Sequence, residues 1–551
     1  EITFNNLYNH TGETNAVNDD GFWRNTGQPN YVTNGVFFIE RGIYNGQLSG
    51  KHYFEDFKNL KLEWLGGYMN ATQEEPDSRV WAYTTAPRSD GSTSYLLQQS
   101  EVGILPSHWW RDLTDEQISG KLDVTFDLVE EKGHKIKFGG YYSDKDREFS
   151  EFFYSQIQVP NNVFNPSYLT FGNAAGDFDQ FFHPDNSGVV DDPESNGTGG
   201  FGFGNVFTDL TFPKNNYVGN ETITAGYLMG VFEVSEKLKL VAGARVEQTK
   251  MEAISEDPTE GVGNIDETDL LPSLNMVYKL SENSNLRLAG TQTLARPNLR
   301  EIAPFASTVT PGRPIFLGNP ELGRSLIQNF DLRYETYMKP GELFAVSLYY
   351  KHFDDPIIYL LTPKASTPEI TPQNVDEAEV YGAELEFRKS LSFISPALES
   401  LKFSANMSLI YSKVDKSEEE LEALRREQAD GKRLNIKDYR PFQGQSPYII
   451  NVGLTHVSSK LSWENTVSFN IWGERLAFQS GALDPDVYEQ ARPSLNFVSN
   501  KQLGEKFSVK FRASNILNMK YLKEYDFAES PVFESFRYGT TLSLGVTYNM
   551  K

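Results

Sequence analysis

The chain has 551 residues, of which 39% are apolar and 13% aromatic, with no cysteine and a formal net charge of −24. This charge argues against a nucleic-acid-binding protein, which needs a basic face, and the lack of cysteine excludes disulfides and thiolate metal sites. No stretch of eighteen apolar residues occurs, which excludes a membrane-spanning helix. Few apolar but many aromatic residues favour a sheet that is apolar only at alternate positions.

Segments in which apolar and polar residues alternate recur along the whole chain. They include residues 60–68, 121–128, 135–142, 238–247, 329–335, 343–350, 401–411, 447–457, 461–472, 507–514 and 536–551. We count about nineteen such segments, many of them about nine to twelve residues long, the length that a tilted strand needs to cross a bilayer. In the last segment the apolar face runs from Phe536 to Met550, and Gly539, Thr541, Ser543 and Gly545 lie opposite. We therefore expect this segment to be one strand between lipid and a lumen.

The connections between these segments alternate in length. Short ones are centred near residues 235, 282, 340 and 459, and long ones lie near 160–216, 304–326, 362–377 and 415–446. Short turns on one rim and long loops on the other are typical of outer-membrane barrels. The sequence thus predicts an all-β, antiparallel, up-and-down transmembrane barrel as one domain over residues 1–551. A capping box of Ser417 and Glu420 predicts a short helix in the last long loop.

Four stretches resemble the barrel of a TonB-dependent receptor, particularly the forms found in the Bacteroidota. They are TLARPNLREIAPF (293–305), NVDEAEVYGAELEFRK (374–389), RPFQGQSPYIINVGL (440–454) and ASNILNMKYL (513–522), in the order and spacing of the family. Their residues also have structural explanations, which we favour over ligand contact. Pro297 and Pro447 suit strand ends, Gly382 and Gly453 suit close packing in a strand, and Asn515 and Asn518 suit a turn.

The resemblance implies an outer-membrane transporter of a Gram-negative bacterium, which takes up a siderophore, cobalamin, glycan or peptide. The implied partners are the lipid bilayer with lipopolysaccharide, a plug domain of the same receptor, and the TonB–ExbB–ExbD system, with a surface lipoprotein or larger envelope complex as a further partner. Family barrels have twenty-two strands, and no segment here resembles a plug. We therefore expect the plug, and the first strands of the barrel, to lie outside this chain.

Candidate ligand-binding residues are aromatic residues that do not fit the strand pattern. His108, Trp109, Trp110 and Arg111 are predicted to lie together between strands, where they would stack on sugars or aromatic chelators; an aromatic belt at the membrane interface is the alternative. Phe201 and Phe203 are further candidates in a Gly-rich loop.

Candidate lumenal residues are Arg245, Glu247, Arg333 and Glu335, which would line a translocation path or contact the plug; hydration of a polar face is the alternative.

A candidate Ca²⁺ site is the acidic loop with Asp185, Asp191, Asp192 and Glu194, which lacks the spacing of an EF-hand.

No enzyme motif and no cofactor-binding motif occurs, so we predict neither an activity nor a cofactor. Three alternatives to a transporter remain at this point. They are a receptor-like barrel that serves as a scaffold in an outer-membrane assembly or protein-export complex, a passive channel, and a soluble all-β binding protein.

Overall fold

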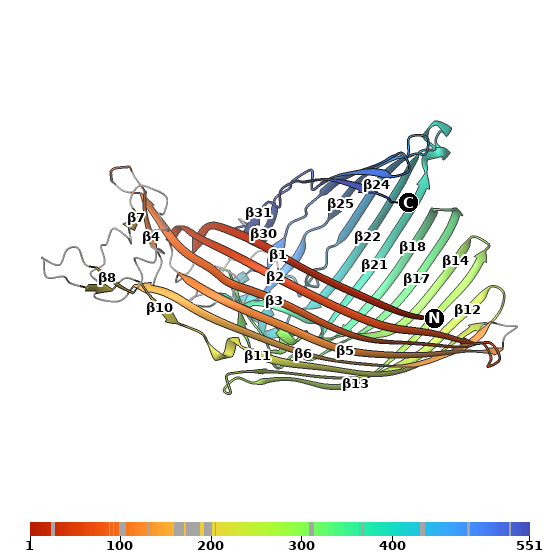
Figure 1. Cartoon of the computed structure of the whole chain (residues 1–551), viewed down its shortest axis with the longest axis horizontal. Helices are drawn as coiled ribbons and strands as arrows, with labels where there is room; N and C mark the ends of the chain where they lie inside the picture. The colour runs from red at the N-terminus through yellow and green to blue at the C-terminus, as the bar shows by residue number, and fades with distance from the viewer. Residues whose placement is uncertain are drawn as a thin grey trace.

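The computed structural model describes residues 1–23, 28–87, 89–91, 93–97, 106–129, 133–158, 170–171, 188–191, 201–203, 205–307, 313–362, 364, 368–429, 436–481, 485–527 and 530–550. Within these ranges the main sheet contains 22 strands. Four of them are short: β4 (Thr93–Leu97), β7 (Thr170–Phe171), β10 (Asn205–Asp209) and β23 (Tyr439–Arg440). The remaining eighteen follow one another in chain order, each antiparallel to the next, as an up-and-down barrel requires (Figure 1).

These eighteen strands vary from 8 to 28 residues in length, and the longest belong to the first part of the chain. They are β1 (Ile2–Trp23), β2 (Gln28–Phe54), β3 (Leu60–Pro87), β5 (Ser107–Val129), β6 (His134–Gln158), β11 (Tyr217–Glu233), β12 (Leu238–Ser255), β13 (Val262–Ser281), β14 (Ser284–Ala295), β17 (Ser325–Lys339), β18 (Glu342–Asp354), β21 (Glu377–Ser390), β22 (Leu401–Asp415), β24 (Tyr448–Ser458), β25 (Trp463–Trp472), β28 (Ser494–Leu503), β29 (Phe507–Ser514) and β32 (Thr541–Tyr548).

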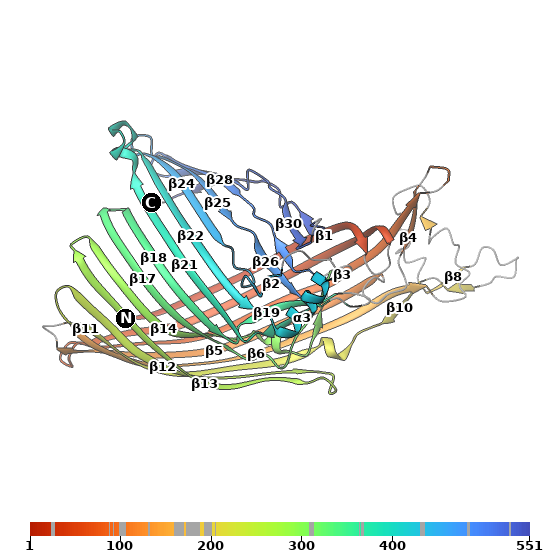
Figure 2. The ribbon, with the colours of Figure 1, turned by 180° about the vertical axis from the view of Figure 1, so that it is seen from behind.

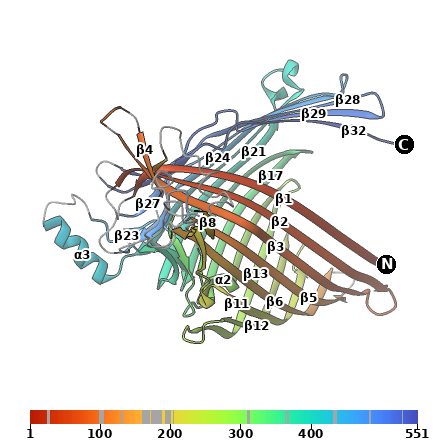
Figure 3. The same cartoon turned by 60° about the vertical axis from the view of Figure 1, so that its left-hand side comes forward.

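The long connections contain structure of their own. A second, eight-stranded sheet consists of β15 (Ala306–Ser307), β16 (Ile315–Leu317), β20 (Glu369–Asn374), β19 (Ile357–Thr362), β26 (Arg475–Ser480), β27 (Val487–Glu489), β30 (Tyr521–Tyr525) and β31 (Val532–Phe536). Other elements are α2 (Leu299–Ile302), α3 (Glu418–Ala429), the pair β8 (Val189–Asp191) and β9 (Phe201–Phe203), and the 3-10 helices η4 (Pro213–Asn215), η5 (Leu391–Phe393) and η6 (Pro396–Leu398). Helix α3 lies at the long-loop end of the barrel, as Figures 2 and 3 show. The helix predicted in that loop is confirmed, with the Ser417 hydroxyl accepting from the Glu420 amide.

An apolar belt surrounds the barrel on its outer face. On β22 it runs from Leu401 to Tyr411, about 33 Å of strand, which projects to about 25 Å of height at the usual tilt. Tyrosines form its border on the side of the long loops, where the rings of Tyr350 and Tyr381 are 4.8 Å apart and that of Tyr411 follows at 6.4 Å. An apolar belt of this height with an aromatic girdle is the lipid-facing surface of a membrane barrel. No helix in the described part of the chain is long and apolar enough to cross a membrane.

The strands β1, β2, β3, β5 and β6 are the longest of the described sheet, and Figure 1 shows that they extend beyond the later strands on one side. On β5 the continuous row of outward apolar residues begins at Ile118, so that Ser107 to Gln117 extend the strand by about 36 Å beyond the belt. Beta-bulges shift the register between β2 and β3 and between β3 and β5, and Asp77 at the second of these has a φ of 51°. Bulges increase the local twist and bend of a sheet, so this overhang, as we call the part of the five strands beyond the belt, is not a straight continuation of the barrel.

The last segment differs from the prediction of one strand over residues 536–551. Phe536 ends β31, and the main-sheet strand β32 begins only at Thr541. The break occurs because Gly539 has a φ of 81°, outside the strand region, and is held by two turn residues: the Asn515 amide donates to its carbonyl, and its own amide donates to the Asn518 side chain. From Thr541 onward the predicted alternation is confirmed by the pairing with β29, in which Leu544 lies opposite Phe511 and Ser543 lies opposite Arg512.

The structural explanations of the motif residues are confirmed as well. Pro447 directly precedes β24, and Pro297 lies two residues after the end of β14. A side chain at Gly382 would collide with the ring of Tyr349, which lies 2.0 Å from the Cβ position, and one at Gly453 would meet the Ser404 hydroxyl at 2.5 Å. Both glycines therefore allow an inward side chain of the neighbouring strand to lie across them.

Candidate functional site: the lumen and its rim

The four predicted lumenal residues lie on the inner face of the barrel, opposite to the apolar belt. On β12, the Arg245 Nε donates to Glu247 Oε2 at 2.6 Å. Glu247 is buried and also pairs with Arg296, whose Nε donates to the Thr249 hydroxyl at 2.8 Å. This carboxylate thus connects β12 to the segment that leaves β14.

Arg333 and Glu335 form a second ionic group on β17. Glu335, buried at 3% exposure, accepts from Arg287 of β14 at 2.7 Å and from Arg333 at 3.1 Å. Arg333 also reaches Glu386 of β21 at 3.1 Å. The structure therefore brings the predicted residues into two separate ionic groups that join neighbouring strands, and it does not gather them into one site.

The prediction that His108, Trp109, Trp110 and Arg111 lie between strands is wrong, because all four belong to β5. Their side chains alternate across the overhang, so they cannot form one cluster. His108 and Trp110 are on the outer face with their rings stacked at 6.2 Å, whereas Trp109 and Arg111 are on the inner face. The sequence did not show this because the outer face loses its apolar pattern beyond Ile118 while the strand continues.

The inner pair belongs to a small core of the overhang. Trp109 is 1% exposed and packs against Phe37, Val80 and Phe153. The Arg111 guanidinium lies 4.7 Å from the centre of the Trp109 ring, and its Nε donates to Glu151 at 2.5 Å. In the outer pair, Trp110 is half-buried, whereas His108 is buried and binds Asp77 through Nδ1 at 2.7 Å. Ligand binding by these residues stays a prediction.

The remaining candidates are only partly described. The backbones of Phe201 and Phe203 form β9, which pairs with β8, where Asp191 lies. Asp185, Asp192 and Glu194 lie outside the described residues. In the part of the chain that the structure describes, no group of three acidic or histidine side chains is placed to hold a metal ion.

Residues 298–305, which the sequence did not mark as functional, fold back onto the inner wall near the long-loop rim. Leu299 and Ile302 of α2 are buried against the inward side chains of β11, β12 and β13, with Tyr217, Met251 and Ile265 in the same core. A capping box between Asn298 and Glu301 starts the helix. The remaining Glu301 oxygen accepts from the Tyr359 hydroxyl of β19. Desolvation raises the pKa of Tyr359, and this hydrogen bond raises it further.

This platform, residues 298–305, presents Arg300 on its accessible side. The guanidinium centre lies 4.4 Å from the ring centre of Phe316 and 5.9 Å from that of Phe305. Desolvation lowers the pKa of Arg300, and the nearby Arg111 and Arg147 lower it further. Its signal in the sequence was the Asn298–Glu301 capping pattern, which predicts a helix start but not its inward fold.

The platform depends on a close backbone approach at Gly318. A Cβ at this position would lie 1.9 Å from the Ala303 carbonyl oxygen. We expect Gly318→Ala to destabilise the platform by about 1–3 kcal/mol, because a backbone atom cannot move aside as a side chain can. The measurement is cleavage of residues 296–324 by added protease in detergent, together with the urea unfolding midpoint.

The matched control is Gly323→Ala in the same connection, where the nearest atom to the new Cβ is 3.9 Å away. This variant is expected to resist the protease as the parent chain does. Equal resistance of both variants would show that the platform can shift without loss.

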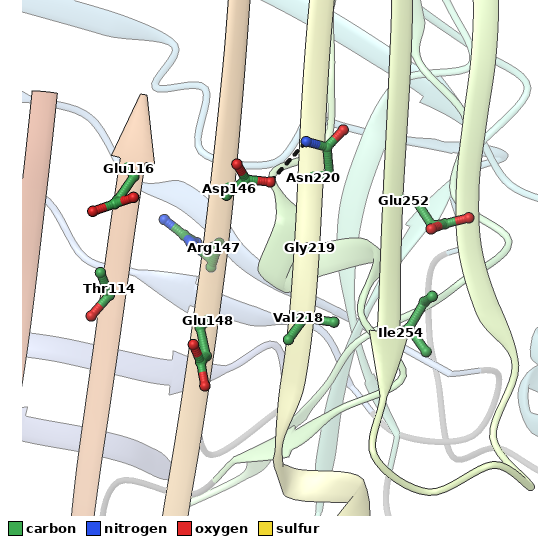
Figure 4. A pocket seen from close by; sticks show the side chains of 10 residues that line it. All are labelled: Thr114, Glu116, Asp146, Arg147, Glu148, Val218, Gly219, Asn220, Glu252 and Ile254. Atoms are coloured by element: carbon green, nitrogen blue, oxygen red, sulfur yellow. Dashed lines mark hydrogen bonds between the residues drawn. The ribbon is translucent and has the colours of Figure 1, made fainter. Parts of the chain in front are cut away.

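A shallow groove of about 530 Å³ lies outside the lumen, on the outer face just beyond the belt. Figure 4 shows four acidic residues around it, Glu116 of β5, Asp146 and Glu148 of β6 and Glu252 of β12, with Asn220 of β11 donating to Asp146 at 3.0 Å. Arg147 points to the other side of the sheet, where it binds Asp115. The groove thus contains none of the predicted ligand-binding or lumenal residues.

Belt, girdle, loop-rich rim and polar lumen together define a transmembrane β-barrel of the outer-membrane type. Two solved structures have this fold: the ferric citrate transporter FecA in its unliganded form, with 11% identity and a TM-score of 0.53 over 100% of this chain and 78% of that chain, and the copper transporter OprC, with 10% identity and a TM-score of 0.51 over 100% of this chain and 79% of that chain. At these identities the likeness establishes the fold alone. No curated protein matches the sequence.

The sequence profile of the outer membrane protein beta-barrel family matches residues 199–548. The chain therefore belongs to this family, and its place is the outer membrane of a Gram-negative bacterium.

Proposed function

We propose that this chain is the barrel of a TonB-dependent receptor of the Bacteroidota type, which takes up a scarce nutrient across the outer membrane. The substrate is of the siderophore, cobalamin, glycan or peptide class. A plug domain of the same receptor fills the lumen, and the TonB–ExbB–ExbD system supplies the energy.

The observation that carries this proposal is the lumen itself. Its walls hold ionic groups such as Arg333, Glu335 and Glu386, and the platform folds into it at the rim. Glu335 is buried, whereas Arg333 and Glu386 are half-exposed to the lumen, so the wall offers charged partners to a folded domain inside the barrel. The fold shared with two metal or metal-chelate transporters supports the same function by analogy.

Uptake by cells tests the proposal. Deletion of the gene is expected to abolish uptake of one labelled nutrient among the four classes, and deletion of TonB in an otherwise intact strain is expected to do the same. The reason is that a plugged barrel passes its substrate only when energy reaches the plug.

The control is a strain that carries the complete gene on a plasmid, in which uptake should return. If uptake of all four classes survives both deletions, and the protein instead co-purifies with an envelope export or assembly complex, the scaffold function replaces this proposal. Uptake that requires the barrel but not TonB would identify a passive channel.

A further inference from the structure

The inner face of the barrel has two unlike walls. From β2 to β21 almost every strand presents Lys, Arg, Asp or Glu to the lumen, mostly in ion pairs such as Lys61–Glu63, Arg147–Asp115 and Arg333–Glu386. In the middle of β22, β24, β25 and β28 the inward side chains are instead small and uncharged; they include Asn406, Ser408, Asn451, Thr455, Ser468 and Asn496. Larger apolar side chains point inward toward the long-loop ends of these strands, namely Ile410, Ile449 and Trp472. We call these the charged wall and the neutral wall.

The two charged exceptions on the neutral wall lie at its border. Lys402 and Glu464 each stand one residue inside a strand end beside the short-turn rim. No ion pair is formed by an inward side chain of these four strands, all of which lie within the described ranges. The division therefore concerns the whole middle of the lumen, where a solute would have to pass.

Inward side chains of the neutral wall are hydrogen-bonded to one another across neighbouring strands. The Asn451 amide donates to Asn406 at 2.6 Å, the Asn470 amide donates to Asn451 at 2.6 Å, and the hydroxyls of Thr455 and Thr466 are 3.1 Å apart. Short side chains bonded sideways leave space in the lumen. Their hydroxyl and amide groups can exchange bonds with a hydrated solute at little cost, because each neutral hydrogen bond contributes only about 1 kcal/mol.

The charged wall has the opposite properties. Its long side chains are fixed by charge-assisted bonds, which are about twice as strong as neutral ones. Breaking such a pair leaves a half-buried, unpaired charge, which costs free energy. These side chains therefore do not move aside for a passing solute, but they can bind a folded domain with complementary charges. Passage requires binding weak enough for release, and this condition is met on the neutral wall.

We propose that the domain in the lumen is held by the charged wall and that the substrate passes along the neutral wall formed by β22, β24, β25 and β28. This inference rests on the proposed function, since it requires a plug and its movement by TonB. It adds which side of the lumen opens.

The lack of cysteine in the chain provides a direct test. Ser468→Cys on the neutral wall and Ser273→Cys on β13 of the charged wall are matched variants, because both are half-buried inward serines within a strand. Each is placed in the complete receptor, with Asn496→Cys as a second neutral-wall position. A membrane-impermeant maleimide is applied to cells with an energised TonB system and to cells whose proton-motive force is collapsed.

Labelling at Ser468→Cys and Asn496→Cys is expected to rise several-fold on energisation, while Ser273→Cys stays protected. A rise at Ser273→Cys that equals or exceeds the rise at the other two overturns the assignment of the walls but leaves TonB coupling intact. Labelling that ignores energisation at all three positions removes the proposed function itself, and this inference with it. The heat-dependent mobility of each variant on gels verifies that it is folded.

Discussion

Val467→Arg is expected to prevent stable insertion of the barrel, whereas Ser468→Arg, one residue further on, is expected to insert. Val467 is 42% exposed on the outer face in the middle of β25, with Leu454 and Phe497 as its neighbours on the adjacent strands. A charge at this depth of the bilayer costs about 2–4 kcal/mol. The side chain at position 468 points into the lumen, where water or a polar domain can solvate the guanidinium.

Refolding into lipid vesicles measures this difference. The folded fraction follows from the gel mobility of unheated samples, and the free energy of unfolding follows from urea titration. The same loss of stability in both variants would mean that the outer face of β25 does not meet lipid, and the membrane barrel would have to be abandoned for this part of the chain.

Trp109→Ala is expected to unfold the overhang without releasing the barrel from the membrane. The indole is 1% exposed, and its ring centre lies 5.8 Å from that of Phe37 and 6.3 Å from that of Phe153. Truncation of a buried tryptophan costs about 3–5 kcal/mol, and the Arg111 guanidinium would lose the ring beneath it. Protease cleavage within residues 70–117 is expected to rise, while the fragment that contains the belt stays folded.

Trp110→Ala is the matched control, since this indole is half-buried on the outer face of the same strand. It is expected to leave protease resistance close to that of the parent chain. The pair also separates the two explanations of this segment. If Trp110→Ala abolishes uptake while the overhang stays intact, the outer indole binds ligand; if only Trp109→Ala has an effect, the segment is structural.

The barrel itself could be predicted from the sequence because lipid on one face and water on the other produce a regular alternation of apolar and polar residues. Leu409, Val467 and Leu544 face lipid, and the residues adjacent to them in the sequence, Ser408, Ser468 and Ser543, face the lumen. The number of strands follows from the same alternation: about nineteen predicted segments compare with the eighteen long strands among the 22 of the described sheet.

The rim could not be predicted in this way, because it obeys a different rule. Beyond the girdle both faces of β3 and β5 meet water or protein, so alternation no longer marks a strand, and Trp109 was placed in a loop. The eight-stranded second sheet consists of strands of two to six residues, too short to show a period. The position of Arg300 depends on contacts between α2 and three strands remote in sequence, which no local pattern encodes.

The overhang has a consequence for how this molecule is held together. Along β5 the apolar face changes sides: Ile118 and Leu122 point outward, but Trp109 points inward. Near the short turns this strand thus has its apolar side chains on the outside of the barrel. At its far end it has them in an interior core, as in a water-soluble protein. The lower part is stable only in a lipid-like medium, while the upper part owes its cohesion to the expulsion of water. A detergent that stabilises the lipid-facing half of this strand therefore does not stabilise the other half.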